Sequence, residues 1–192
     1  PGDVVTAQQV HGVHVGLISD FGFRIADLSN TDALITAIPG VMLSLRFADC
    51  VPILLYDPVR QAVGVAHAGW KGTVAGIVGK TVQAMTDAFG TRPGDLLAGI
   101  GPSIGPCCYA VDEERARLVR AAFPWWPRVL KRSHPWHLDL WQANYRQLVE
   151  AGLAPQQIEA AGLCTACHTQ DFYSHRAEHG HTGRFAAVIG LT

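Results

Sequence analysis

Residues 51–70, with the sequence VPILLYDPVRQAVGVAHAGW, constrain the fold more than any other stretch of the chain. They contain two apolar runs of strand length on either side of a turn signal at Asp57-Pro58. Two strands joined by a short turn pair as an antiparallel hairpin, and the open end of this one carries both Cys50 and His67. The sequence therefore predicts that a thiol and an imidazole are neighbours at one end of a sheet.

Six further runs are short, apolar or alternating, and bounded by Gly, Pro or Asp, which is typical of strands. They are residues 14–18, 32–36, 41–47, 96–101, 158–164 and 185–191. Residues 72–90, 111–123 and 138–152 have apolar residues at helical spacing, and Asp139 is the expected N-cap of the last segment. Closely spaced strands followed by strands that alternate with helices predict a mixed α/β (α+β) fold. The Pro- and Trp-rich residues 123–137 are expected to form a long loop.

The composition, with 48% hydrophobic and 16% charged residues, predicts a single domain over residues 1–192. The 15 basic residues nearly balance the 16 acidic ones, which argues against nucleic acid or an anionic membrane as the main partner. No apolar run approaches the roughly 20 residues of a membrane span. Because the five cysteines are an odd number, we expect reduced thiols in a cytoplasmic protein rather than a disulfide framework. The oligomeric state is left open.

The segment CTACH, residues 164–168, has the letters of a haem-attachment site and, with the histidines after it, of a zinc cluster. Haem often takes Met as an axial ligand, and the chain has only two methionines. Zinc fingers separate the cysteine pair from the histidine pair by about twelve residues, whereas His175 follows Cys167 by only eight. A closed zinc site stays an alternative, but a partly buried thiol pair followed by solvent-facing histidines is preferred. The vicinal Cys107 and Cys108 are expected to pack rather than to bind an ion.

Three potential metal ligands each lie where an apolar run meets a turn: His11 in QQVHG, Cys50 in FADC and His67 in AHAGW. Such junctions present functional side chains to a cleft. The residues alone leave a metal site and an unrelated thiol and histidine equally open. The loop GPSIGP, residues 101–106, carries backbone N–H groups ahead of a helix and could hold an anion or a ligand carbonyl.

Seven motifs occur in the order QQVHG, ADCVPILLYDP, AHAGWKGT, GPSIGPCCY, LDLWQAN, CTACH and FYSHR. In these motifs, and over nearly the whole chain, the sequence resembles the YfiH family. This family is also called the laccase-domain, multicopper polyphenol oxidoreductase or peptidoglycan editing factor family. The resemblance implies mixed sheets layered between helices, and a catalytic metal site formed by His11, Cys50 and His67. It also implies that CTACH forms a wall of this site rather than the site itself.

The resemblance further implies which residues contact the substrate. Tyr173 and Arg176 belong to the FYSHR segment, Ser103 belongs to GPSIGP, and Lys71 follows the histidine of AHAGW closely enough to meet an anion. Members of the family carry several dozen more residues before QVHG, including a Ser-x-Arg-x-Gly-Gly motif whose Arg is implicated in substrate binding. This sequence does not contain that motif, and we expect full activity to need it.

Two imidazoles and one thiolate give zinc three protein ligands and an open fourth position, which is the catalytic pattern. With the resemblance, this pattern predicts a zinc-dependent purine nucleoside phosphorylase with adenosine deaminase activity. Its substrates would be phosphate and adenosine, inosine, guanosine or methylthioadenosine. Copper is a possible substitute for zinc at the same ligands.

Three alternatives remain. One is a copper-dependent, laccase-like polyphenol oxidoreductase, although a multicopper enzyme needs several paired histidines, and the nine histidines include one His-x-His, at His179 and His181. The others are an editing hydrolase for peptidoglycan precursors and a metal-free hydrolase with Cys50 as nucleophile and His67 as base.

Two residues near the expected site have two interpretations each, and a third has a candidate catalytic role. Asp49 either orients a histidine N–H or caps a strand end. Trp70 either packs or stacks on a purine ring. His175 is a candidate general base.

Overall fold

The computed structural model of the chain describes residues 3–19, 28–133 and 135–192. Its largest sheet is mixed: the outer pairs β2–β3 and β11–β7 are parallel and the inner pairs are antiparallel. The predicted hairpin is confirmed, because β5 and β6 pair with Pro52 opposite His67. In spatial order the six strands are β11 (Ile158–Ala160), β7 (Leu97–Ile100), β5 (Val51–Asp57), β6 (Ala62–Ala68), β3 (Ala33–Thr36) and β2 (Val15–Ile18).

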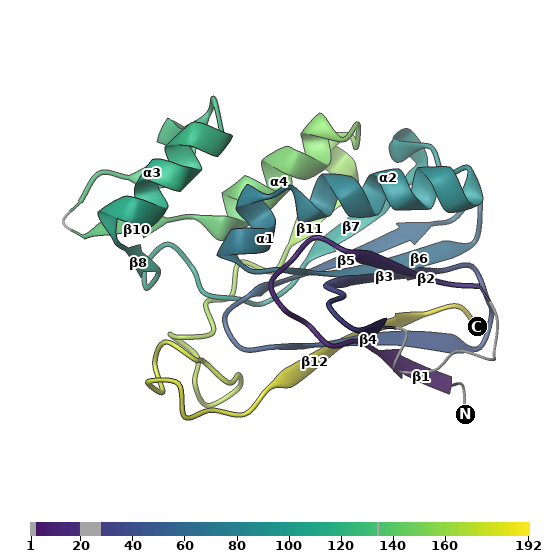
Figure 1. Ribbon diagram of the computed structural model, residues 1–192, viewed down its shortest axis with the longest axis horizontal. Helices are drawn as coiled ribbons and strands as arrows, with labels where there is room; N and C mark the ends of the chain where they lie inside the picture. Colours follow the sequence, from purple (N-terminus) through teal and green to yellow (C-terminus); the bar gives the residue numbers. More distant parts are fainter. Residues whose placement is uncertain (1–2, 20–27, 134) are drawn as a thin grey trace.

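A second sheet of three strands lies below the large one (Figure 1). Along its central strand, side chains that are buried alternate with side chains that are not: Leu43, Leu45 and Phe47 are buried, while Arg46 is exposed. The buried side chains pack between the two sheets, which explains the alternating pattern seen in the sequence. In spatial order the strands are β1 (Asp3–Thr6), β4 (Val41–Phe47) and β12 (Phe185–Gly190).

The helices lie on the other side of the large sheet (Figure 1). They are α1 (Trp70–Val74), α2 (Ile77–Phe89), α3 (Glu113–Ala122) and α4 (Leu140–Glu150), with the short 3-10 helices η2 (Pro93–Asp95), η3 (Trp126–Arg128) and η4 (Pro155–Gln157). The single helix expected over residues 72–90 is in fact two helices, because Gly76 adopts a φ of 81° between them. The Asp139 cap is confirmed, since its carboxylate accepts the backbone N–H of Gln142 at 2.9 Å.

The expectation of a long loop over residues 123–137 is wrong. This stretch contains η3 and two strands of a third small sheet, in which β10 (Trp136–Leu138) pairs with β8 (Ala110–Val111) and β9 (Leu130–Lys131). Phe123 and Trp125 stack with ring centroids 4.3 Å apart. Aromatic packing therefore orders a segment whose prolines hide any strand periodicity.

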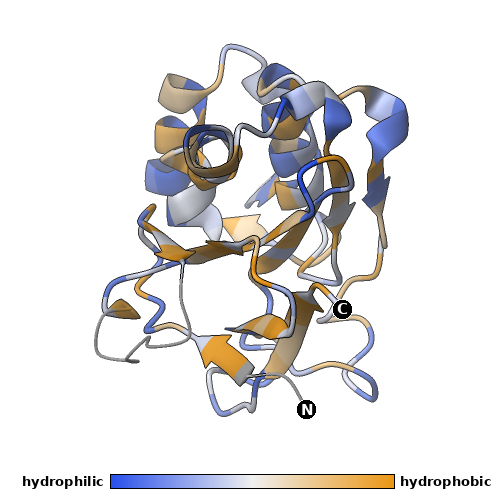
Figure 2. Cartoon of the chain, turned by 90° about the vertical axis from the view of Figure 1, so that its right-hand side faces the viewer, coloured by the Kyte–Doolittle hydropathy of each residue, from blue (hydrophilic) through white to orange (hydrophobic). Residues whose placement is uncertain are grey.

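Two hydrophobic clusters fill the spaces between the three layers. One lies between the helices and the large sheet and includes Ile53, Met85 and Leu148, and the other lies between the two sheets and includes Phe47 and Val65. Figure 2 shows the hydrophobic strands of the two sheets facing each other below the helical layer. All seven residues of β6 are buried because the strand is covered on both faces. The mixed, layered α/β architecture agrees with the prediction.

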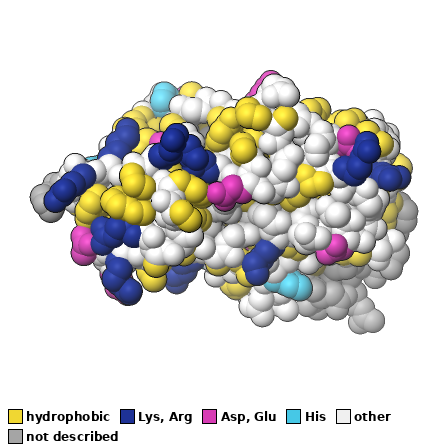
Figure 3. Space-filling model, turned by 90° about the horizontal axis from the view of Figure 1, so that it is seen from above, with side chains coloured by type: hydrophobic (Ala, Val, Ile, Leu, Met, Phe, Trp, Pro, Cys, Tyr) yellow, Lys and Arg dark blue, Asp and Glu magenta, His cyan; other side chains and the backbone are white. Residues whose placement is uncertain are grey.

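On the helical side of the molecule the larger group of Lys and Arg side chains gathers toward the end that carries α3, among hydrophobic side chains (Figure 3). Within the described ranges, no helix combines the length and the apolar character that crossing a membrane requires.

Candidate metal and ligand site

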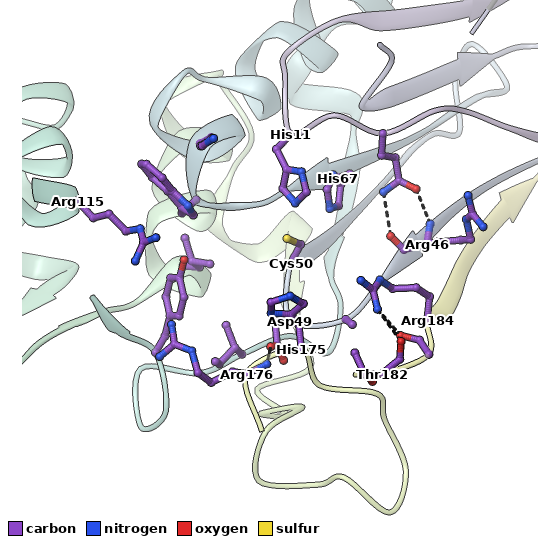
Figure 4. Close-up of a pocket in the computed structure, with 18 of the residues that line it drawn as sticks. His11, Arg46, Asp49, Cys50, His67, Arg115, His175, Arg176, Thr182 and Arg184 are labelled. Atoms are coloured by element: carbon purple, nitrogen blue, oxygen red, sulfur yellow. Dashed lines mark hydrogen bonds between the residues drawn. The ribbon is translucent and has the colours of Figure 1, made fainter. Parts of the chain in front are cut away.

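The structure brings His11, Cys50 and His67 together at one end of the space between the two sheets (Figure 4). His11 comes from the loop after β1, Cys50 directly precedes β5, and His67 lies near the end of β6. Their potential ligand atoms all lie within 4.8 Å of one another. The antiparallel pairing of β5 and β6 produces the contact between Cys50 and His67 that the hairpin predicts.

A buried carboxylate, Asp32, organises two of these ligands. Its Oδ1 lies 2.8 Å from Nδ1 of His67 and accepts the backbone N–H of His11 at 2.8 Å, while Oδ2 accepts the N–H groups of Val10 and Gly12. His11 has a φ of 62°, a left-handed conformation that these hydrogen bonds hold in place. Because Nδ1 of His67 is engaged by Asp32, its Nε2 is the nitrogen left to face Cys50 or an ion.

The charges of this cluster support one another. Burial opposes ionisation of Cys50, but hydrogen bonds from His11 and His67 outweigh it and lower the pKa of the thiol. Burial likewise opposes protonation of His67, yet Asp32 and the Cys50 sulfur raise its pKa above the ordinary value. The metal-free cluster therefore favours a thiolate next to a protonated His67 of fixed orientation, and an ion that binds here would replace the proton on the His67 ring.

Gly69 gives the cluster its space. A Cβ atom at this position would lie 2.9 Å from Sγ of Cys50 and 2.9 Å from Cδ2 of His11. A side chain there would fill the volume into which the sulfur and the imidazole point. Any residue can adopt the φ of −68° that Gly69 has, so the backbone does not require glycine here. The site requires it, because a larger residue would fill the space of the cluster. The donor types, their convergence and this open volume all fit a metal ion.

The three residues of the cluster line a cleft of about 1140 Å³. Five cationic side chains line the cleft, whereas Asp49 is the one acidic side chain among its described lining residues. Figure 4 shows four of these cations around the mouth of the cleft. The cationic residues are Arg46, Lys71, Arg115, Arg176 and Arg184. A cleft of this charge attracts a small anion.

Two aromatic residues lie beside these cations. The Arg115 guanidinium carbon lies 5.3 Å from the centroid of the Trp70 ring, and that of Arg176 lies 5.2 Å from the Tyr109 ring. Both distances are typical of cation–π contacts, which hold the long arginine side chains in place. Trp70 therefore packs against Arg115, and both aromatic residues also line the cleft.

The structure separates the predicted substrate residues into two groups. Lys71 and Arg176 line the cleft, as does His175. Ser103 is fully buried behind the wall, and its hydroxyl accepts the indole N–H of Trp141 at 2.7 Å. Tyr173 is 48% exposed and its ring lies against Gly183, outside the described lining of the cleft. Neither Ser103 nor Tyr173 is among the described lining residues of the cleft, although Tyr173 lies against Gly183, which is one of them.

The loop of residues 101–106 does not offer free N–H groups to an anion. The amides of Gly101, Ser103 and Ile104 donate to backbone carbonyls, and that of Gly105 donates to Sγ of Cys164. The expectation of an anion-binding loop is therefore wrong, because the constrained backbone is used to connect the loop to its neighbours.

Asp49 has neither of its two expected roles. Its carboxylate accepts hydrogen bonds from Thr165 Oγ1, Ser174 Oγ and the backbone N–H of Arg176, at 2.7, 2.8 and 2.6 Å. It thus joins the strand end that carries Cys50 to the C-terminal segment that carries Arg176. Orientation of a histidine is performed by Asp32 instead.

Sequence reasoning missed Asp32 and three of the cleft arginines, Arg46, Arg115 and Arg184. Arg46 is an outward residue of an alternating strand, and Arg115 belongs to an amphipathic helix. Nothing in either pattern separates an arginine that faces a cleft from one that faces solvent. Asp32 is the first residue of an apolar run, and a carboxylate at the start of such a run is the feature of the sequence that indicates a buried polar residue.

A mixed α/β fold of this layered kind is shared with solved structures. The crystal structure of Bacillus licheniformis hypothetical protein YfiH matches with a TM-score of 0.93 at 40% identity, over 99% of this chain and 74% of that chain. The chain belongs to the family described as multi-copper polyphenol oxidoreductase laccase, whose model matches residues 1–192. The predicted family is confirmed.

Relatives in this family include proteins named for a different reaction. The chain is 44% identical over 166 residues to "Purine nucleoside phosphorylase YlmD" of Bacillus subtilis, which covers 85% of this chain and 60% of that protein. It is also 44% identical over 190 residues to "Purine nucleoside phosphorylase" of Deinococcus radiodurans, which covers 98% of this chain and 70% of that protein. The chain thus spans less than two thirds of the Bacillus subtilis relative.

Proposed function

We propose that the chain carries the nucleoside and phosphate site of a purine nucleoside phosphorylase, with a zinc ion held by His11, Cys50 and His67. The observation that carries this proposal is that the His₂Cys cluster and five cationic side chains line the same cleft. The names of the relatives support the same reaction class.

Phosphate is the substrate that the cations favour. A phosphate dianion needs several charge-assisted hydrogen bonds, and Arg46, Arg176 and Arg184 supply guanidinium groups that can bind oxygen atoms in pairs. Lys71 is exposed at the start of α1 and adds a point charge. The carboxylate of Asp49 does not compete with the phosphate, because it is already occupied by three donors.

The purine would lie against the aromatic wall of the cleft. Trp70 and Tyr109 offer ring surfaces there. Their cation–π contacts with Arg115 and Arg176 keep these two guanidinium groups near the base. In this arrangement the ribose lies between the base and the phosphate. That order brings C1′ of the ribose next to a phosphate oxygen, as phosphorolysis requires.

In the reaction a phosphate oxygen forms a bond to C1′ while the bond between C1′ and the purine nitrogen breaks. The purine leaves with the electron pair and takes up one proton, so the products are the free base and ribose 1-phosphate. Among the described lining residues, His175 is the histidine outside the metal cluster, and we assign it the proton transfer to the leaving base.

A bound zinc ion would supply Lewis acidity at its open coordination position. The chain's own contribution is to hold the donors. Asp32 fixes the ring of His67, Gly69 leaves room for the ion, and the hydrogen bonds to Asp32 fix the backbone of His11.

Adenosine deamination is a second activity that this cleft could support. Deaminases of nucleobases hold zinc through histidine and cysteine ligands and use a carboxylate to move protons. The donor set here is similar, but the cleft carboxylate Asp49 is fully engaged. His175 would have to move the protons, so we expect deamination to be slower than phosphorolysis.

The test is a turnover assay with the zinc-loaded chain, inosine and phosphate. We expect hypoxanthine and ribose 1-phosphate to form only when phosphate is present, and the rate to fall at least about a hundredfold in His67→Ala. Phosphate binding is measured calorimetrically on the same samples, because the chain spans 60% of the Bacillus subtilis relative and turnover could need further residues. Absence of both turnover and phosphate binding would reject the proposal.

Two other reactions are separated by simple controls. Full activity after chelation, with inactivation by iodoacetamide at Cys50, would favour the metal-free Cys–His hydrolase. Phenol oxidation that requires copper would favour the oxidoreductase. Within the described residues, however, the His₂Cys group is the one cluster of three or more potential ligands that contains histidine, so a further three-copper centre has no ligands there.

A further inference from the structure

Four cysteines form a second cluster, separate from the His₂Cys group. Cys107 and Cys108 follow the GPSIGP loop, while Cys164 and Cys167 begin and end the CTAC turn after β11. Their four Sγ atoms all lie within 4.8 Å of one another. None of them belongs to the described lining of the cleft, so the proposed reaction does not use them.

The spacing of the sulfurs fits a tetrahedral ion. Zinc–sulfur bonds of about 2.3 Å place the sulfurs of a Cys₄ site about 3.8 Å apart. Here Sγ of Cys167 lies 3.4 Å from that of Cys108 and 3.7 Å from that of Cys107. All four cysteines are free, and these separations are well above the roughly 2.05 Å of a disulfide bond.

The backbone supports the same conclusion. The amides of Cys167 and His168 both donate to the carbonyl of Cys164, which closes the C-x-x-C turn and points both sulfurs to one side. The amide of Gly105 donates to Sγ of Cys164 at 3.2 Å, a contact that stabilises a thiolate ligand. Vicinal cysteines usually diverge, but here both Cys107 and Cys108 reach the sulfur of Cys167.

We propose that Cys107, Cys108, Cys164 and Cys167 bind a second zinc ion in a closed tetrathiolate site. Four protein ligands leave no open position, so the ion has a structural and not a catalytic role. Cys107 and Cys167 are exposed, which gives the ion a route into the site from solvent. The expectation that the vicinal pair serves packing alone is replaced by this role.

The site would fasten two loops that form one wall of the cleft. The segments of Ser103 and Cys164 already pair: the backbone N–H of Thr165 donates to the carbonyl of Ser103, and the N–H of Ser103 donates to the carbonyl of Leu163. From the cluster one loop leads to Tyr109 and the other to Arg176, which both line the cleft. An ion bound by both loops would therefore fix the distance between these two side chains.

The experiment counts zinc in Cys50→Ser protein without a histidine tag, purified under reducing conditions. This substitution removes the first site, so the outcome does not depend on the proposed function. We expect one retained zinc ion, with an X-ray absorption spectrum that fits four sulfur atoms at about 2.3 Å and no nitrogen. Adding Cys107→Ser or Cys167→Ser, at exposed positions where folding should be preserved, should remove the ion.

Hydrogen exchange provides a second measurement on the Cys50→Ser protein. Chelation should increase exchange in residues 101–110 and 164–176 and leave β5 and β6 unchanged. Three results would overturn the proposal: no retained zinc, a coordination shell that contains nitrogen, or an intact mass that shows disulfide formation under the reducing conditions. Circular dichroism checks that each serine variant is folded.

Discussion

Oδ1 of Asp32 lies 2.8 Å from Nδ1 of His67, although the two residues are 35 positions apart in the chain. The same carboxylate holds the backbone of His11, so one buried side chain positions two of the three ligands. In metal sites, such carboxylates set the tautomer and the orientation of a ligating histidine.

We therefore expect Asp32→Asn to lower zinc affinity at the His₂Cys site by about 10–100-fold. The amide removes the charge and turns one acceptor into a donor that opposes the surrounding N–H groups. Affinity is measured by competition with a chromophoric chelator, in a background where Cys107 is replaced by serine. Asp57→Asn is the matched control, since Asp57 is equally buried but lies at the far turn of the hairpin. Unchanged affinity in Asp32→Asn would show that the contact does not position a ligand.

Gly69→Ala should abolish zinc binding at the same site without unfolding the protein. The added methyl group would lie 2.9 Å from Sγ of Cys50, and the backbone of residue 69 tolerates alanine. Gly79→Ala is the control, because that position in α2 has open space around it and alanine favours a helix by about 1 kcal/mol. The measurements are zinc content and thermal unfolding. A Gly69→Ala protein with full zinc content would contradict the described geometry.

The Asp57 carboxylate should stabilise the hairpin in a pH-dependent manner. Burial opposes its ionisation, but the backbone amides of Arg60 and Val59, each at 2.9 Å, outweigh this and lower its pKa below the ordinary 3.8. A lowered pKa in the folded state gives stability that is present above pH 3.8 and is lost as the pH falls through the folded-state value.

At pH 7 we expect the free energy of unfolding of the wild-type protein to be about 1–2 kcal/mol higher than that of Asp57→Asn. The difference should shrink when both proteins are measured well below the ordinary pKa of aspartate. Urea unfolding of the two proteins side by side cancels effects that they share, such as loss of metal in acid. A difference that stays constant with pH would rule out the charge as its origin.

Arg115→Gln should weaken phosphate binding by about threefold, because it removes one cation from the field of the cleft while the cations assigned to the phosphate stay. Arg117→Gln is a close control on the same helix, since Arg117 is exposed and is not among the described lining residues. Calorimetric titration with phosphate at fixed ionic strength measures both variants. Equal weakening in the two would indicate a general charge effect rather than a binding site.

The local pattern of the sequence determined the secondary structure that carries the site. Strand-length apolar runs around Asp57-Pro58 predicted the hairpin, and its antiparallel pairing placed Cys50 beside His67. These features depend on residues close in sequence, where periodicity and turn chemistry dominate. Family resemblance, rather than periodicity, added His11 to the pair.

The tertiary structure decided which side chains meet across long distances in the chain. Asp32 became the partner of His67 because β3 pairs with β6, and Cys107 and Cys108 met Cys164 and Cys167 because β7 pairs with β11. Local spacing carries no information about such contacts, since they depend on strand order and on the direction of each loop. The sequence by itself therefore determined the hairpin and one ligand pair, whereas packing decided the structure of residues 123–137, the cationic cleft, the orienting carboxylate and the four-cysteine cluster.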